Sequence, residues 1–384
     1  MPVSQPPAFL HHPSTARAYR CVCGAQVFFR NSACLQCGRA LGFDPWLGQV
    51  LAIEPEADTG LWHAADPGAA GEPRRYRRCA QIDSPALCNW LVVDRPELGP
   101  AQAPCSCAAC RLNRTIPDLQ LGANHEPWSK VELARRRLVS QLIGLGLPVE
   151  PRSPDGGNGG LAFDTLASMQ GQPLVMTGHL MGVVTLNLAE ADDAYRERIR
   201  TAMNEPYRTL LGHYRHEVGH YYWDRLVRLD RSLWDFRALF GDERIDYDTA
   251  LQRHYREGVR FDWRESHITA YACSHPWEDW AETWAHYLHM RDTLDTAVSF
   301  GLSPDRFDVD AAQYDTAVLQ GGAAPVDPEG FLTMLNAWTR LTGVLNELSR
   351  SMGLQDFYPF VLSQTVVRKL HFVHARVAPF ERRG

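Results

Sequence analysis

The sequence feature that most constrains the fold is a His-Glu-x-x-His pattern, whose histidines are His216 and His220. Side chains four residues apart lie on one face of an α-helix, so the two imidazoles can bind the same metal ion. Glu217 lies one step around the helix, where its carboxylate can hold a metal-bound water without binding the metal itself. Apolar residues at helical spacing predict a helix over 206–228. Leu226 stands where a third histidine would complete the longer form of the pattern, so the third ligand must come from elsewhere.

A second segment, 275–289, contains acids and histidines from which that ligand is expected. Tryptophans and alanines recur at helical spacing after Pro276 and predict another helix. Glu278 and Glu282 share one face of it, where like charges repel unless a cation or hydrogen bonds offset the repulsion. Glu278 as a metal ligand, with Glu282 orienting a ligand histidine, would remove the conflict. The alternatives are two solvated acids on an exposed face and three competing histidine ligands: His275, His286 and His289.

Four cysteines near the start of the sequence form two metal-binding knuckles, Cys21-x-Cys23-Gly24 and Cys34-x-x-Cys37-Gly38. This spacing is typical of a zinc ribbon rather than of disulfides or free thiols. The glycine after each knuckle can adopt positive φ and let backbone N–H groups approach the thiolates. A unit of about 25 residues cannot bury a sufficient core, so we expect zinc to stabilise it.

A second group of cysteines offers one thiolate more than a tetrahedral zinc site needs. Cys107-x-x-Cys110 has the better knuckle spacing, but Cys105 could replace Cys110 and form a Cys-x-Cys pair with Cys107. The five members of the group are Cys79, Cys88, Cys105, Cys107 and Cys110.

The composition is that of a globular protein, with 45% hydrophobic and 22% charged residues. The net charge of −6 argues against a general affinity for phosphate backbones, and the few clustered arginines are expected to pair with the chain's own acids. Residues 1–20 hold no apolar core of signal-peptide length, and no run approaches the roughly 18 apolar residues of a membrane span. We therefore expect a cytoplasmic protein with no membrane span and no nucleic-acid partner. The sequence specifies no oligomeric state.

Most of the chain resembles the bacterial zinc-binding metallopeptidases that carry an N-terminal zinc ribbon. The His-Glu-x-x-His motif with the distant Glu278-x-x-x-Glu282 resembles the gluzincin metallopeptidases. Tyr271 stands seven residues before Glu278, a spacing similar to that in the catalytic domain of anthrax lethal factor, where such a tyrosine assists at the oxyanion. The segments that match the ribbon-bearing family are Cys34-x-x-Cys37-Gly38, Leu41-Gly42-Phe43-Asp44, Tyr76-Arg77-Arg78-Cys79, Cys88-Asn89-Trp90-Leu91-Val92, Cys110-Arg111-Leu112-Asn113-Arg114-Thr115-Ile116-Pro117, the His-Glu-x-x-His helix and the Trp277 to His286 helix.

The resemblance implies an α+β fold in which small cysteine-rich zinc modules precede a mainly helical, zincin-like domain with a small sheet. We expect a zinc ribbon over 1–45, a second cysteine module over 46–124 and the metallopeptidase domain over 125–384. The resemblance also favours four cysteines for the second structural zinc: Cys79, Cys88, Cys107 and Cys110.

The β-branched segment 182–188 predicts a strand. In gluzincins the strand before the active-site helix often lies at the sheet edge, where an extended peptide can add as a further strand. We therefore expect substrate contacts from Val184, Thr185 and Asn187.

The function expected from these features is zinc-dependent hydrolysis of a peptide or protein, with one catalytic and two structural zinc ions. Glu217 would act as the general base, Tyr271 as the first choice of oxyanion donor and His275 as the second. The alternative is a non-catalytic, zinc-stabilised scaffold or regulator that binds a protein or nucleic acid through its ribbons.

Overall fold

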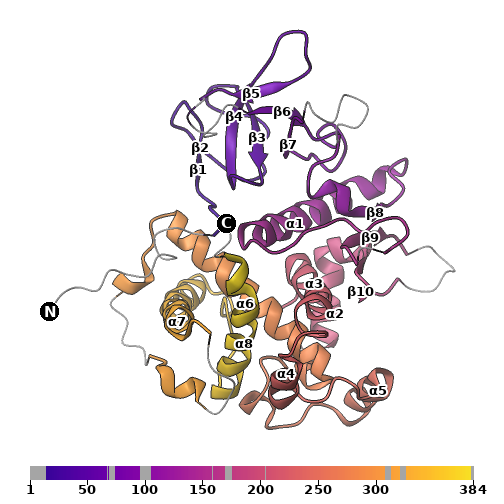
Figure 1. The fold of residues 1–384 in the computed structure, drawn as a ribbon, viewed down its shortest axis with the longest axis vertical. Coiled ribbons are helices and arrows are strands. Elements are labelled where there is room, and N and C mark those ends of the chain that lie inside the picture. Colours follow the sequence, from indigo (N-terminus) through magenta and orange to yellow (C-terminus); the bar gives the residue numbers. More distant parts are fainter. Residues whose placement is uncertain are drawn as a thin grey trace. The chain divides into compact units, whose positions relative to one another are not determined.

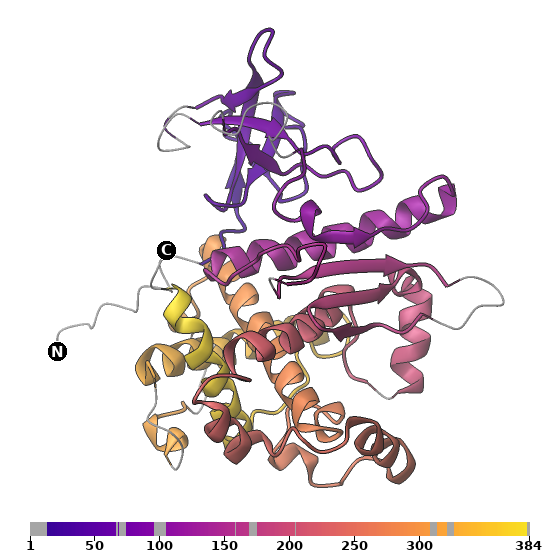
Figure 2. The ribbon, with the colours of Figure 1, turned by 45° about the vertical axis from the view of Figure 1, so that its right-hand side comes forward.

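The computed structural model, drawn in Figures 1 and 2, describes residues 14–66, 68, 74–95, 105–157, 159–168, 175–203, 205–307, 313–320 and 326–381. The chain divides into two compact units, whose described parts fall within 14–199 and 200–381. Helices and several small sheets together make the α+β fold predicted from the sequence. The first unit contains all the strands, and the second contains the larger helices apart from α1.

The zinc ribbon and the sheet that follows it share one aromatic core. Phe43 lies 4.8 Å from Phe29 and 5.0 Å from Trp90 between ring centroids, so ribbon and sheet side chains pack together. The amide of Asn89 donates to the Phe29 carbonyl at 2.9 Å and adds a polar link. The β3–β4 hairpin spans residue 45, at which the sequence predicts the end of the ribbon, and the division at that residue stays a prediction. Two short strands, β1 (Tyr19–Arg20) and β2 (Gln26–Val27), pair with each other. Five strands form the antiparallel sheet that follows: β3 (Ala40–Asp44), β4 (Gln49–Pro55), β5 (Trp62–Ala64), β6 (Arg75–Arg78) and β7 (Leu91–Val93).

A second sheet of four strands has the order β10-β11-β9-β8. The expectation that the segment around Thr185 forms a sheet edge is wrong, because β11 pairs with β10 on one side and with β9 on the other. Met181 and Gly182 both have positive φ, and this tight turn folds β10 back onto β11. The strands are β8 (Asn113–Thr115), β9 (Ala162–Leu166), β10 (Gly178–Leu180) and β11 (Val183–Asn187).

Helix α1 (His125–Gly144) runs beside this sheet, as both ribbon views show. The Arg135 guanidinium lies 5.6 Å from the Phe163 ring centroid of β9 and also pairs with Glu132 in a fully buried ion pair. After β11 the chain continues through a 3₁₀ turn (Leu188–Ala191) into α2 (Asp193–Ala202). The sequence boundary between the two compact units falls within α2, between residues 199 and 200.

The second unit is built around the crossing of α3 (Leu210–Leu226) and α6 (Pro276–Ser299). Gly219 lies at the crossing, where a Cβ atom would meet the Ala281 Cα at 3.0 Å. The Trp280 indole donates to the Gly219 carbonyl at 2.8 Å, which the close approach permits. The remaining helices are α4 (Leu233–Phe240), α5 (Tyr247–Glu257), α7 (Pro328–Ser351) and α8 (Gln364–Glu381).

Helix α8 holds the start of α6 through a buried lysine. The Lys369 ammonium donates to the Ser266 carbonyl at 2.6 Å and to the carboxylate of Asp279. Its side chain is 3% exposed, so the ion pair is shielded from solvent.

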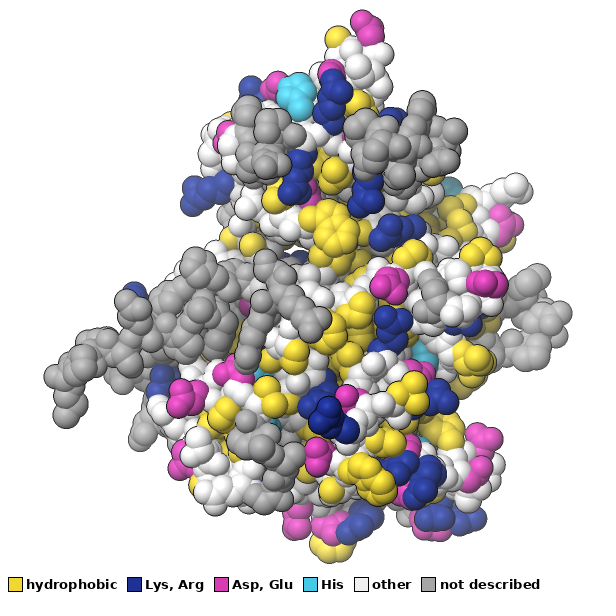
Figure 3. Space-filling view, viewed as in Figure 1, with side chains coloured by type: hydrophobic (Ala, Val, Ile, Leu, Met, Phe, Trp, Pro, Cys, Tyr) yellow, Lys and Arg dark blue, Asp and Glu magenta, His cyan; other side chains and the backbone are white. Residues whose placement is uncertain are grey.

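None of the described helices combines the length and apolar character that crossing a membrane requires. On the face drawn in Figure 3, the visible Lys and Arg side chains are interspersed with Asp and Glu and form no continuous basic surface over the described residues.

Candidate metal centres

The first candidate metal centre joins helix α3 to the first turns of α6. Thr209 caps α3 by accepting a hydrogen bond from the Gly212 N–H, which explains why the helix begins later than predicted. One ligand atom each from His216, His220 and Glu278 lies within 4.8 Å of the others. Two imidazoles and one carboxylate are a donor set that zinc prefers, and three protein ligands leave a fourth position open.

The orientation of His216 makes this a site for a cation. Its Nδ1 lies 2.6 Å from the Glu282 carboxylate, so Nδ1–H donates, and in the neutral imidazole Nε2 carries the lone pair that a metal ion can bind. Glu278 Oε2 lies 2.9 Å from that Nε2 atom and has no hydrogen-bond partner among the described residues. A carboxylate oxygen and an imidazole nitrogen this close repel each other unless a proton or a metal cation lies between them, and two imidazoles with one carboxylate form a donor set that fits a zinc ion.

The electrostatics of the site agree with this geometry. Burial would lower the pKa of His216, but Glu278 and Glu282 outweigh it and raise that pKa well above its usual value. Burial would raise the pKa of Glu278, but His220 and His216 outweigh it and hold that pKa well below the usual carboxyl value. The carboxylates are thus kept ionised beside the imidazoles, which favours bound positive charge.

Glu217 lies on α3 beside this cluster without belonging to it. Its side chain is buried, and burial raises the pKa of its carboxyl even though the two neighbouring imidazoles act in the opposite direction. A carboxyl with a raised pKa accepts a proton more readily at neutral pH than an ordinary surface glutamate.

The two predicted oxyanion donors have different surroundings. The Tyr271 ring lies 6.0 Å from the His216 ring, and burial, followed by the charge of Glu278, raises the pKa of Tyr271 well above its usual value. Its hydroxyl is therefore a hydrogen-bond donor at neutral pH. His275 instead caps α6, where its Nδ1 accepts from the Trp277 N–H at 3.1 Å and its Nε2 donates to the Ile245 carbonyl at 3.0 Å. Both ring nitrogens of His275 are thus engaged away from a substrate.

Spacing within the motifs did not identify Tyr247, whose hydroxyl donates to Glu278 Oε1 at 2.8 Å. It belongs to α5 and lies 31 residues from Glu278 in sequence, so no helical or knuckle pattern connects the two. Of the competing histidines, His286 contacts the Tyr358 hydroxyl at 2.8 Å and His289 stacks on the Tyr358 ring, and neither belongs to the metal-binding cluster.

The first unit holds two cysteine quartets, each with sulfur atoms within 4.8 Å of one another. In the ribbon, the backbone N–H of Arg39 lowers the pKa of Cys37 to about 6, which favours the thiolate that zinc requires. Cys105 is exposed and lies outside the second quartet, so the structure separates it from the four cysteines that come together. The quartets are Cys21, Cys23, Cys34 and Cys37, and Cys79, Cys88, Cys107 and Cys110.

The predicted substrate contacts lie on β11 in the first unit. Val184 is fully buried, and Asn187 accepts from the Ala189 N–H as the cap of the following turn. Thr185 is partly buried and faces Gly178 in the register of the β10–β11 pair. A role in substrate binding for these three residues stays a prediction.

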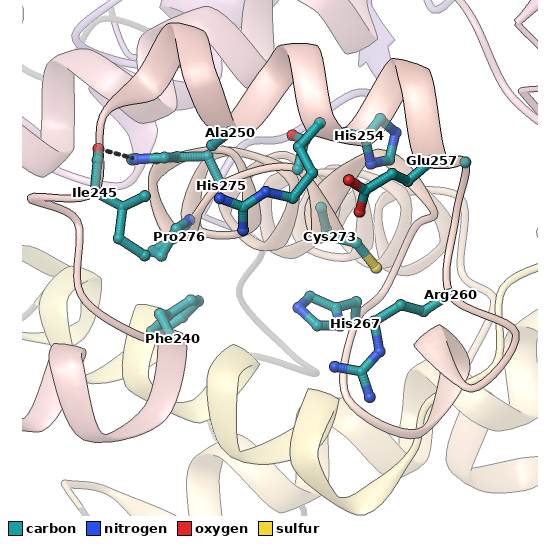
Figure 4. A pocket seen from close by; sticks show the side chains of 14 residues that line it. Phe240, Ile245, Ala250, His254, Glu257, Arg260, His267, Cys273, His275 and Pro276 are labelled. Atoms are coloured by element: carbon teal, nitrogen blue, oxygen red, sulfur yellow. Dashed lines mark hydrogen bonds between the residues drawn. The ribbon is translucent and has the colours of Figure 1, made fainter.

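A cavity of about 360 Å³ lies between α5 and the segment 272–276 (Figure 4). Burial lowers the pKa of His267 to about 4 and raises the pKa of Cys273 to about 11, so both side chains are uncharged at neutral pH. The lining does not include the three metal ligands. Figure 4 shows His254 and Glu257 reaching into it from α5, and the hydrogen bond between His275 and Ile245 at its other end.

Comparisons with known proteins agree with this arrangement of sites. Models of two families match the chain: one described as "Putative zinc-binding metallo-peptidase" over residues 124–376 and one described as "zinc-ribbon domain" over residues 18–121. Uncharacterized proteins from Mycobacterium bovis and from two strains of Mycobacterium tuberculosis are each 42% identical over 356 residues, or 92% of this chain and 93% of the relative. No solved structure matches the chain significantly. The chain belongs to this family of zinc-binding metallopeptidases and carries an N-terminal zinc-ribbon domain.

Proposed function

We propose that the chain is a zinc-dependent peptidase of the gluzincin type, with zinc held by His216, His220 and Glu278. The observation that carries this proposal is the cluster of His216, His220 and Glu278, in which one ligand atom of each residue lies within 4.8 Å of the others. Glu282 fixes the tautomer of His216, as carboxylates commonly do for metal-bound histidines. Two further zinc ions in the cysteine quartets would serve structure.

Each residue around the site has a distinct part in amide hydrolysis. A zinc ion held by these three ligands would supply Lewis acidity for activating a water and polarising the scissile carbonyl. Glu217 takes a proton from the attacking water on its carboxylate and passes it to the leaving amide nitrogen. The Tyr271 hydroxyl donates a hydrogen bond to the oxygen on which negative charge develops.

The proposal is tested by replacing the base without touching the metal ligands. We expect Glu217→Gln to lower peptide hydrolysis by about 100-fold to 10,000-fold, the range typical of general acid–base catalysis, with bound zinc unchanged. Turnover of a quenched-fluorescent peptide library and elemental analysis provide the two readouts. Glu265→Gln, a substitution of an exposed glutamate in the same unit, is the matched control.

Peptide hydrolysis by Glu217→Gln at the wild-type rate would rule out this mechanism. A wild-type chain that binds zinc at the site but cleaves no peptide in the library would instead favour the non-catalytic scaffold, which has no need of a base.

The assignment of the two acids on α6 has a separate test. Glu278→Gln is expected to lose the zinc ion of this site, whereas Glu282→Gln should retain it with an affinity lowered by about 10-fold to 100-fold, because only an orienting hydrogen bond is lost. Competition with a chelator measures both effects. The reverse pattern would exchange the roles of the two glutamates.

A further inference from the structure

We propose that Tyr247 is a positioning residue that decides which oxygen of Glu278 faces the metal, and that His275 holds Tyr247 in place through the Ile245 carbonyl. The inference rests on the proposed metal site and adds two residues from outside the ligand set. Both act through Glu278, which is why we assign them no contact with substrate.

The first step is that the two oxygens of the Glu278 carboxylate have different partners. Glu278 is 1% exposed, so its oxygens depend on protein partners. Oε1 accepts from the Tyr247 hydroxyl at 2.8 Å, while Oε2 lies 2.9 Å from His216 Nε2. The hydrogen bond uses one lone pair of Oε1, whereas Oε2 has no hydrogen-bond partner among the described residues and is therefore the oxygen more available to the metal. Without the hydroxyl, Oε1, which lies 3.5 Å from His220 Nε2, would compete for the same ion.

The second step is the position of Tyr247 itself. His275 caps α6 three residues before Glu278, and its Nε2 donates to the Ile245 carbonyl, two residues before Tyr247 (Figure 4). Asp246 between them caps α5 by accepting from the Thr249 N–H. The first turns of the two helices are therefore joined twice, once through a backbone carbonyl and once through the Tyr247 hydroxyl.

Ring packing restricts the tyrosine further. The Tyr247 ring lies edge-on to His275 at 5.3 Å and to Trp277 at 6.1 Å between centroids. The hydroxyl of this ring donates to Glu278 Oε1 at 2.8 Å. The same elements that hold the ring thus direct the hydroxyl at one carboxylate oxygen.

The test uses zinc affinity, which does not depend on finding a substrate. In Tyr247→Phe the ring remains and only the hydroxyl is lost, so we expect the affinity of this site for zinc to fall by about 10-fold to 100-fold in chelator competition. In the cobalt-substituted protein, the visible absorption should also change, because both carboxylate oxygens can then bind. The chain with His216→Ala and His220→Ala supplies the background from the cysteine sites.

Two other tyrosines serve as controls. Tyr255→Phe alters an exposed side chain on the same helix and should change neither readout. Tyr271→Phe should lower kcat by more than it lowers zinc affinity, because its hydroxyl is assigned to the oxyanion and reaches Glu278 only through its interaction with Tyr247.

The link through His275 is tested with asparagine, which can still cap a helix but cannot reach two partners as imidazole does. His275→Asn should lower zinc affinity in the same direction as Tyr247→Phe but by less. The double variant should bind zinc no more weakly than Tyr247→Phe alone, because His275 acts through Tyr247.

Wild-type zinc affinity and an unchanged cobalt spectrum in Tyr247→Phe would overturn the proposal, as would fully additive effects of the two substitutions. Loss of zinc in Tyr247→Phe from a chain without peptidase activity would support the positioning role while the proposed function fails, so the two failures can be told apart.

Discussion

Glu282 follows Glu278 by four positions, and the two carboxylates lie at opposite ends of one imidazole. Glu278 Oε2 faces His216 Nε2, and Glu282 Oε1 contacts His216 Nδ1. One turn of helix therefore places like charges where a shared histidine contacts both of them and offsets their repulsion. The repulsion between the two carboxylates, which their spacing predicts, is offset by their contacts with His216 rather than by exposure to solvent.

At the same scale, buried His374 is expected to make the stability of the second unit depend on pH. Burial, followed by the charge of Arg291, lowers the pKa of His374 to about 4, below the value of 6.5 for an unperturbed histidine. Between these values, the unfolded chain takes up a proton that the folded chain does not, so stability is lost as pH falls. By pH 5 the loss from this residue is about 2 kcal/mol.

Urea unfolding of wild type and His374→Gln at pH 7 and pH 5 measures this effect. The variant should lose less stability than wild type between the two pH values. An equal loss in both proteins would mean that His374 titrates alike in the folded and unfolded chain.

A residue pattern predicts only those members of a metal centre that lie at a regular spacing in the sequence. His216 and His220 lie together because four residues make one helical turn, and Glu278 and Glu282 follow the same rule on α6. Tyr247 has no such relation to any of them, because helix packing alone brings it to Glu278. His275 has the chemistry of a catalytic donor, yet its place before Pro276 makes it a helix cap.

At the scale of elements, Gly219 allows α3 and α6 to approach. Alanine has a helix propensity about 1 kcal/mol more favourable than glycine. We nevertheless expect Gly219→Ala to destabilise the protein by about 1–3 kcal/mol, because its Cβ would lie 3.0 Å from the Ala281 Cα and 3.2 Å from the Trp284 ring. Thermal unfolding would show a lower Tm.

Gly343 in α7 is the matched control, since a Cβ there has no atom of the described chain within 4 Å. Gly343→Ala should raise the Tm through helix propensity alone. A rise in Tm for both variants would show that the two helices can separate at little cost.

Strand positions were harder to predict than helices. The β-branched content of 183–187 indicates a strand, but it does not reveal which neighbours the strand has. The covering strand β10 is three residues long and turns at Met181, a residue type that rarely adopts positive φ. Similarly, the spacing of the ribbon cysteines does not reveal that the rings of Phe29 and Phe43 pack face to edge.

At the scale of the whole molecule, the expected metal content is three zinc ions per chain. The helix site and the two cysteine quartets have no ligand in common, so each can be removed separately. We expect elemental analysis to find three zinc ions in wild type and two after His216→Ala with His220→Ala.

Cys88→Ser with Cys107→Ser tests the second quartet, where the two sulfur atoms are 3.7 Å apart. This variant should also retain two zinc ions, with a less stable first unit, because structural zinc contributes directly to folding. An unchanged count of three in the histidine variant would show that α3 binds no metal.

The pairing of Lys369 with Asp279 has a practical consequence for labelling the protein. Among 39 lysine and arginine residues, the two lysines are Lys130 and Lys369. Lys130 on α1 has a side chain that is 45% exposed, whereas that of Lys369 is 3% exposed. Reagents that acylate amines should therefore modify one side chain, Lys130, so that a fluorophore or a surface tether can be attached to the first unit at a single defined point.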